Sequence, residues 1–71
     1  MTLEEFRTDV LTQVQNRPRN VRYGQAVFNY IDYKYGVARF VQFKKHLDCF
    51  YNDDVVDDFI NESYNAYESN I

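Results

Sequence analysis

The 71-residue sequence is short of the residues on which several classes of small protein depend. Its single cysteine, Cys49, excludes an internal disulfide and therefore the disulfide-stapled secreted domains that are common at this length. Cys49 and His46 together fall short of the roughly four ligands that structural zinc needs. No apolar run approaches the ~20 residues that span a bilayer, and the first residues are acidic where a signal peptide is basic. We therefore expect a cytoplasmic protein without a disulfide, a metal or a membrane segment.

Residues that interrupt regular structure are also scarce, because the chain has one proline and two glycines. It contains no repeat, low-complexity tract or domain linker, and its 45% hydrophobic content is too high for a disordered chain. A domain of this size buries only roughly 60% of its unfolded surface, so we expect dense aromatic packing, a partner subunit, or both. Seven tyrosines and six phenylalanines fit that need. The prediction is a single helical domain over residues 1–71.

Apolar residues recur at steps of three and four, the spacing that places them on one face of a helix. The pattern predicts helices at about 3–16, 21–35 and 53–68. Residues 37–47 fit either a strand or a helix, and we favour a helix because a lone strand would have no pairing partner. Residues 48–51 then form a short connector whose two aromatic side chains fill part of the core. The predicted fold class is all-α, a compact bundle of three to four short helices.

Several residues are placed to set the ends of these helices. Thr2 and Glu5 have the spacing of a capping box, in which each side chain accepts from the backbone amide of the other. We expect Asn20 to cap the second helix, and Asn52 or Asp53 to cap the last one.

The two glycines have separate predicted roles. Gly36 follows the second helix, where a residue in the left-handed conformation often ends a helix. Gly24 lies inside that helix and costs it up to ~1 kcal/mol relative to alanine. Unless Gly24 is merely tolerated, another part of the backbone must pass close to it.

Charge is divided unevenly along the chain, and this is the main clue to function. Residues 1–47 hold all eight lysines and arginines against four acids, a net charge of +4, whereas residues 48–71 hold seven acids and no base, a net charge of −7. The acids of the last helix are either solvated helix stabilisers or a contact surface for a basic partner protein, such as one that ordinarily binds nucleic acid. Our leading hypothesis is a small interaction or modulator protein. Its candidate contact residues are Asp53, Asp54, Asp57, Asp58 and Glu62.

The basic residues support an alternative, a nucleic-acid-binding accessory protein. Its candidate contacts are Arg17, Arg19, Arg22, Lys44 and Lys45. The net charge of −3 argues against it, since nucleic-acid-binding domains carry a dominant basic face. Pairing of these residues with the acidic helix, within or between subunits, is the more economical explanation. A third possibility is a purely structural oligomer.

Catalytic signals are weak. His46 and Cys49 are the strongest candidates for a base and a nucleophile, but their spacing supplies no orienting third group, and we expect Cys49 to be a small buried apolar residue. The acidic run 52–58 lacks the glycine of a calcium-binding EF-hand loop, and no phosphate-binding loop, GxSxG or HExxH motif occurs. We therefore expect a protein that is not an enzyme and needs no cofactor.

Tyrosines are concentrated in the second helix. Tyr23, Tyr30, Tyr33 and Tyr35 fall within thirteen residues, more than a narrow core stripe can bury. Some of them must be exposed or lie in an interface, which favours a homo-oligomer.

Two blocks of the sequence carry a resemblance. RYGQAVFN at residues 22–29 and DCFYND at 48–53 resemble an R-x-GQA-x-FN block followed by a D-P-FY-x-D block. These blocks are shared by a group of short uncharacterised proteins from bacteriophage and bacterial genomes, and the likeness covers roughly residues 17–62. Cys49 stands where proline is common in that pattern. The resemblance implies a helical protein that acts in the cytoplasm of a bacterium or an infected host cell.

The residues themselves suggest a role for the two blocks. Gln25 and Asn29 are four apart on one helix face, so their amides can bond the backbone of the connector at 48–52 and act as a latch. The alternative is a small polar site for a peptide, lined by Arg22, Gln25, Asn29 and Tyr51.

Overall fold

Four α-helices and one short 3₁₀-helix make up the regular structure of the computed structural model, which describes residues 1–69. The elements are α1 (Leu3–Gln15), α2 (Tyr23–Lys34), α3 (Ala38–Lys44), the 3₁₀-helix η1 (Asp53–Val55) and α4 (Val56–Ser69). The predicted all-α class is confirmed. The stretch at 37–47, which fitted either a strand or a helix, contains the helix α3, and residues 1–69 contain no strand.

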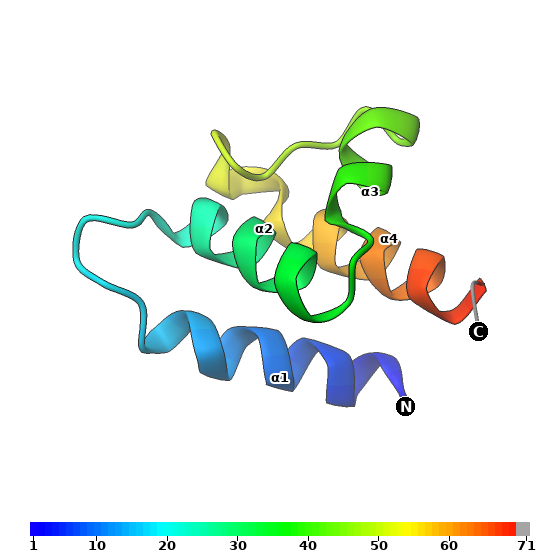
Figure 1. Ribbon diagram of the computed structural model, residues 1–71, viewed down its shortest axis with the longest axis horizontal. Coiled ribbons are helices and arrows are strands. Elements are labelled where there is room, and N and C mark those ends of the chain that lie inside the picture. The colour runs from blue at the N-terminus through cyan, green and yellow to red at the C-terminus, as the bar shows by residue number, and fades with distance from the viewer. Residues whose placement is uncertain (70–71) are drawn as a thin grey trace.

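Helices α1 and α2 form a hairpin, and the short α3 lies at a steep angle across α2 and α4 (Figure 1). Helices α1 and α2 run antiparallel and are joined by the loop at residues 16–22. Helix α4 packs against α1, α2 and α3, so one of its faces is covered by the rest of the bundle. Within residues 1–69, every helix is too short or too polar to cross a membrane.

Two of the predicted caps are confirmed. The Glu5 amide donates to Thr2 Oγ1 at 3.1 Å and the Thr2 amide donates to Glu5 Oε1 at 2.8 Å, which completes the capping box of α1. Ahead of η1, Asn52 Oδ1 accepts from the Asp54 amide at 3.0 Å.

The expected cap of α2 is wrong. The N-cap is Arg22, which makes no side-chain capping bond, and the helix begins at Tyr23 rather than 21. Asn20 falls in a turn closed by the bond from the Val21 amide to the Pro18 carbonyl at 3.1 Å. The amide of Gly24 is instead satisfied from a distant segment, by Asp53 Oδ1 at 2.8 Å.

Both glycine predictions are confirmed. Gly36 has φ 71° and its amide donates to the Ile31 carbonyl at 2.9 Å, which ends α2. At Gly24 a Cβ atom would lie 2.0 Å from the Cys49 carbonyl oxygen, so the connector touches the backbone of α2 directly.

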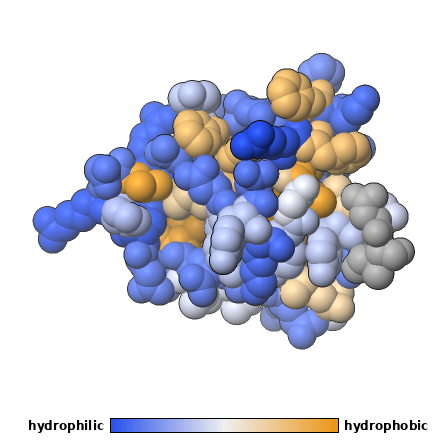
Figure 2. All heavy atoms as spheres, viewed as in Figure 1, coloured by the Kyte–Doolittle hydropathy of each residue, from blue (hydrophilic) through white to orange (hydrophobic). Residues whose placement is uncertain are grey.

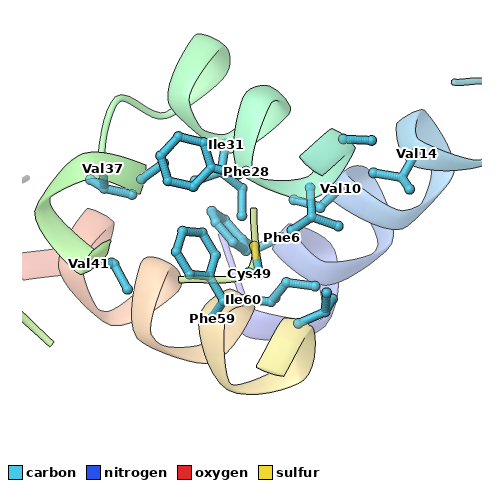
Figure 3. Close-up of a cluster of buried hydrophobic side chains, with 14 of the residues drawn as sticks. Phe6, Val10, Val14, Phe28, Ile31, Val37, Val41, Cys49, Phe59 and Ile60 are labelled. Atoms are coloured by element: carbon cyan, nitrogen blue, oxygen red, sulfur yellow. The ribbon is translucent and has the colours of Figure 1, made fainter. Parts of the chain in front are cut away.

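The core is a single cluster of side chains from all four α-helices (Figure 3). Phe6, Ile31 and Phe59 are fully buried in it, and the Cys49 sulfur lies among them. The connector contributes less than we expected. Phe50 packs edge-on against Phe28, with ring centroids 5.6 Å apart, but Tyr51 is 74% exposed and contacts Phe50 edge-on, with ring centroids 4.7 Å apart. Ile71, which we placed on the buried face of the last helix, lies outside the described residues.

Candidate protein-docking face

The acidic residues of the last helix are directed outward by the packing of α4. Val56, Phe59 and Ile60 are buried against the bundle, and the helical period then turns the intervening carboxylates to the solvent. Carboxylates at this position also stabilise the helix, because they lie beside its unpaired amides and the positive end of its dipole. The acidic face comprises Asp53, Asp54, Asp57, Asp58 and Glu62.

Three carboxylates of the acidic face have partners on other elements. Asp53 Oδ1 accepts from the Gly24 amide, as described above. Asp57 Oδ1 lies 2.5 Å from Arg7 Nη2 of α1, although its side chain remains 72% exposed. Glu62 Oε2 lies 3.8 Å from Lys45 Nζ, just beyond the end of α3. These contacts tie α4 to its neighbours.

Asp54 and Asp58 are different, since both are exposed and neither carboxylate has a hydrogen-bond or ion-pair partner within residues 1–69. Asp54 lies in η1 and Asp58 in the first turn of α4, so both lie at the start of the last helix. Together with the exposed Asp57 they form a cluster of negative charge, which we call the acidic ridge (Asp54, Asp57 and Asp58).

The two sequence blocks meet as a latch, but not through the predicted side chains. The Gly24 carbonyl accepts from Cys49 Sγ at 3.3 Å, and Arg22 Nη2 donates to the Phe50 carbonyl at 3.2 Å. Gln25 and Asn29 make no side-chain hydrogen bond within the described residues. Since Gly24 and Phe28 face the connector, the next residue along is rotated by ~100° away from it.

The alternative polar site is not formed. The Arg22 guanidinium carbon lies 6.0 Å from the centre of the Tyr51 ring, so those two residues are neighbours. Asn29, however, lines a groove beside the first loop, together with Pro18 and Val21. The four residues therefore do not converge.

Cys49 is buried with 0% of its surface exposed, as we expected. Burial, together with the charge of Asp48, raises the pKa of the Cys49 thiol to about 12. His46 is exposed, has φ 53°, and shares no hydrogen bond with Cys49 in the described part of the chain. Within residues 1–69, no three His, Cys, Asp or Glu side chains are grouped closely enough to hold a metal ion.

The candidate nucleic-acid contacts are divided between two regions. Arg17 folds onto its own loop, where Nε donates to the Val21 carbonyl and Nη1 to the Val14 carbonyl, both at 3.0 Å. Arg19 and Arg22 are exposed near the same loop, whereas Lys44 and Lys45 lie at the end of α3, toward the other end of the molecule (Figure 1). The structure therefore does not bring the five residues into one basic patch.

Two basic residues form ion pairs with the acidic helix. One of them, Arg7, was not predicted from the sequence. Arg7 pairs with Asp57 across fifty positions of sequence, a separation that leaves no local signal. Lys45 pairs with Glu62, but the loop arginines Arg17 and Arg19 make no ion pair within residues 1–69.

Three of the four tyrosines in or next to α2 are partly buried and contact other parts of the chain. Tyr30 Oη donates to Asp9 Oδ1 at 2.9 Å, and Tyr35 Oη donates to Asp9 Oδ2. Tyr23 is half-buried, with the Arg17 guanidinium 5.6 Å from its ring centre. Of the four, only Tyr33 is exposed, at 86%.

Asp9 is a second residue that sequence reasoning missed, because its partners lie on another helix. Partial burial alone would raise its pKa. Hydrogen bonds from Tyr35, Lys34 and Tyr30 outweigh that effect, so the pKa of Asp9 is lowered.

The chain matches no protein-family model, no curated protein and no solved structure. Function is therefore inferred from the geometry of residues 1–69. Within that geometry, the acidic ridge is the charged surface with the fewest internal partners.

Proposed function

We propose that this chain is a small, non-enzymatic interaction protein of phage or bacterial type, which acts in the cytoplasm by docking its acidic ridge on a basic partner protein. The observation that carries the proposal is the pair Asp54 and Asp58. Both carboxylates are exposed, and neither has a partner within the described residues.

The arrangement of charge supports a basic partner. The ridge gathers three exposed carboxylates at the start of the last helix. A phosphate backbone also presents closely spaced negative charge, and a partner that ordinarily binds nucleic acid would carry the complementary surface. No lysine or arginine occurs after residue 47 to neutralise the cluster locally.

The expected role of the ridge is steering and specificity rather than most of the affinity. Exposed ion pairs contribute about 0 to 1 kcal/mol each, and salt screens them. Complementary charge speeds encounter and disfavours partners of the wrong sign. Binding through the ridge should therefore weaken as ionic strength rises.

The test is a paired capture experiment with bacterial lysate. One bait is D54N/D58N, which removes two charges from the ridge. The control bait is E4Q/E68Q, which removes two charges at the other end of the molecule (Figure 1). We expect wild type and control to retain the same basic protein at low salt, and D54N/D58N to retain about threefold to tenfold less of it.

Two outcomes would contradict the proposal. If all three baits retain the same proteins in the same amounts, the ridge is not the contact surface. If only nucleic acid is retained, and loss of Arg17 and Arg19 abolishes that binding, the nucleic-acid-binding alternative is correct.

A further inference from the structure

Helix α3 leaves two large aromatic side chains in solvent. Phe40 is 47% exposed and Phe43 is 71% exposed. They are three residues apart, so they share one side of the helix, opposite the buried Ala38 and Val41. Figure 2 shows hydrophobic side chains gathered over α3. Exposed aromatic pairs of this kind mark interaction surfaces more often than isolated exposed residues do.

A groove runs between Phe40 and α4, and its two walls carry opposite charges. Phe40 and Lys45 line the α3 side, and Glu62, Asn65 and Ala66 line the α4 side. Its volume of about 350 Å³ lies at the lower end of the range for small-molecule sites. The basic wall continues outward along α3 through the exposed Lys44.

We propose that a second copy of this chain covers the groove and the aromatic pair, related to the first by a two-fold axis through the groove. A two-fold interface uses the same patch on both subunits, so the patch must be self-complementary. Here the rotation brings the basic α3 wall, with Lys44 and Lys45, against the acidic α4 wall of the other copy, with its Glu62. The phenylalanines of the two copies meet near the axis.

The same charges argue against a phosphate-rich occupant. Arg39 already lies 3.7 Å from Asp32, and Lys45 lies 3.8 Å from Glu62, so the basic wall is partly neutralised. A nucleic acid or an anionic membrane would also meet the acidic wall of α4 directly. A second copy carries both charges on its own groove, so the Lys45–Glu62 pair within each subunit can be exchanged for the same pair between subunits with no charge left unpaired.

The area needed is available. A standard interface buries about 800 Å² on each partner, which is about one sixth of the 4761 Å² that this chain exposes. The acidic ridge does not line the groove itself, but its Asp58 lines a neighbouring hollow with Lys45 and Glu62, so the dimer is tested with variants of its own and without the lysate partner.

The test is sedimentation velocity of charge-exchanged variants across a concentration series. Wild type should form a dimer, with a dissociation constant on the order of 10 µM for an interface of this kind. In the K45E dimer two carboxylates face each other at both symmetric contacts, and in the E62K dimer two ammonium groups do. Each variant alone should therefore weaken the dimer about tenfold. An equal mixture of the two should form a heterodimer of near wild-type affinity, because every contact is then attractive.

A second pair of variants tests the aromatic part of the surface. F43S removes a largely exposed ring from the proposed interface and should weaken the dimer at least about tenfold. The matched control is Y33S, which removes an even more exposed ring from α2 and should leave the dimer unchanged. A wild-type chain that stays monomeric to about 1 mM, or a mixture of K45E and E62K that does not associate, would overturn the proposal.

Discussion

Gly24 is the residue at which two distant segments of the chain are joined. Its amide donates to Asp53 and its carbonyl accepts from Cys49, so both of its backbone polar groups are bonded to the connector region. The same closeness leaves no space for a side chain. A Cβ atom would lie 2.0 Å from the Cys49 carbonyl oxygen and 2.7 Å from Asp53 Oδ1. A rigid backbone atom cannot move aside as a side chain can.

We predict that Gly24→Ala destabilises the protein by about 3 kcal/mol, even though alanine is the better helix former by about 1 kcal/mol. The measurement is chemical denaturation followed by circular dichroism. Gln25→Ala is the matched control, since its side chain makes no hydrogen bond in the described residues, and it should change the free energy of unfolding by less than about 0.5 kcal/mol. Equal effects at the two positions would show that the latch is not made through Gly24.

The reactivity of the Cys49 thiol tests the same latch, because this thiol is buried in it. Burial raises the pKa of its thiol from 9.0 to about 12, and only the thiolate reacts with disulfide reagents. A raised pKa lowers the thiolate fraction, and burial keeps the reagent from the sulfur. We predict that the native protein reacts with a disulfide reagent at least about tenfold more slowly than the protein unfolded in guanidinium. Equal rates in the two states would contradict the buried position of Cys49.

At the scale of elements, one carboxylate of α1 bonds three side chains of α2. Asp9 of α1 accepts from Tyr30, Lys34 and Tyr35 of α2. Its pKa is lowered, so it is ionised more easily in the folded protein than in the unfolded chain. A depressed carboxyl pKa contributes stability above the unfolded pKa, and that contribution is lost as the pH falls through the folded value.

We therefore predict that the stability of the wild type falls below about pH 4, the region of the ordinary Asp9 pKa of 3.8. Asp9→Asn should cost about 2 kcal/mol at pH 7, because it weakens charge-assisted bonds. The difference between the two proteins should shrink as the pH is lowered, and thermal denaturation from pH 7 to pH 2 measures it. A difference that stays constant over this range would exclude Asp9 as its source.

Much of the element pattern was predictable from local sequence. The apolar periodicity placed every helix to within a few residues, and the cap of α1 and the glycine that ends α2 follow from residues in contact along the chain. Asn20 is not the cap because residues 18–21 form a turn and α2 begins only at Tyr23, where the amide of Gly24 is bonded by Asp53, 29 positions away. The latch was predicted between the correct blocks but through Gln25 and Asn29, since the sequence alone does not specify which face of α2 meets the connector.

The candidate docking site was less predictable than the fold. A count of charges located the acids on the last helix, but it did not distinguish those that are bonded internally from those that are free. Asp53 and Asp57 have partners on α2 and α1, and Arg7 carried no signal in the sequence. The exposed aromatic surface also lies on α3 rather than on the tyrosine-rich α2, because Asp9 draws two of those tyrosines inward.

At the scale of the whole molecule, the uneven charge of the sequence is only partly neutralised by folding. Arg7 and Lys45 each neutralise one carboxylate of α4, which leaves Asp54 and Asp58 without a partner near the start of the helix and the groove beside α3 further along it. The proposed partner surface and the proposed dimer surface adjoin at Asp58, which lines a hollow with Lys45 and Glu62. A dimer would carry two acidic ridges, and a partner with two basic sites would bind it more tightly than it binds the monomer.

The most direct test of the docking face is carboxyl footprinting of the chain before and after it captures its partner from lysate. A carbodiimide activates exposed carboxylates, the amine of glycine ethyl ester displaces the resulting urea to form an amide, and mass spectrometry reports the extent of labelling at each position. We predict that Asp54 and Asp58 become protected in the complex while Glu4, at the start of α1, is labelled as before. Unchanged labelling of Asp54 and Asp58 in a complex that has demonstrably formed would contradict the account.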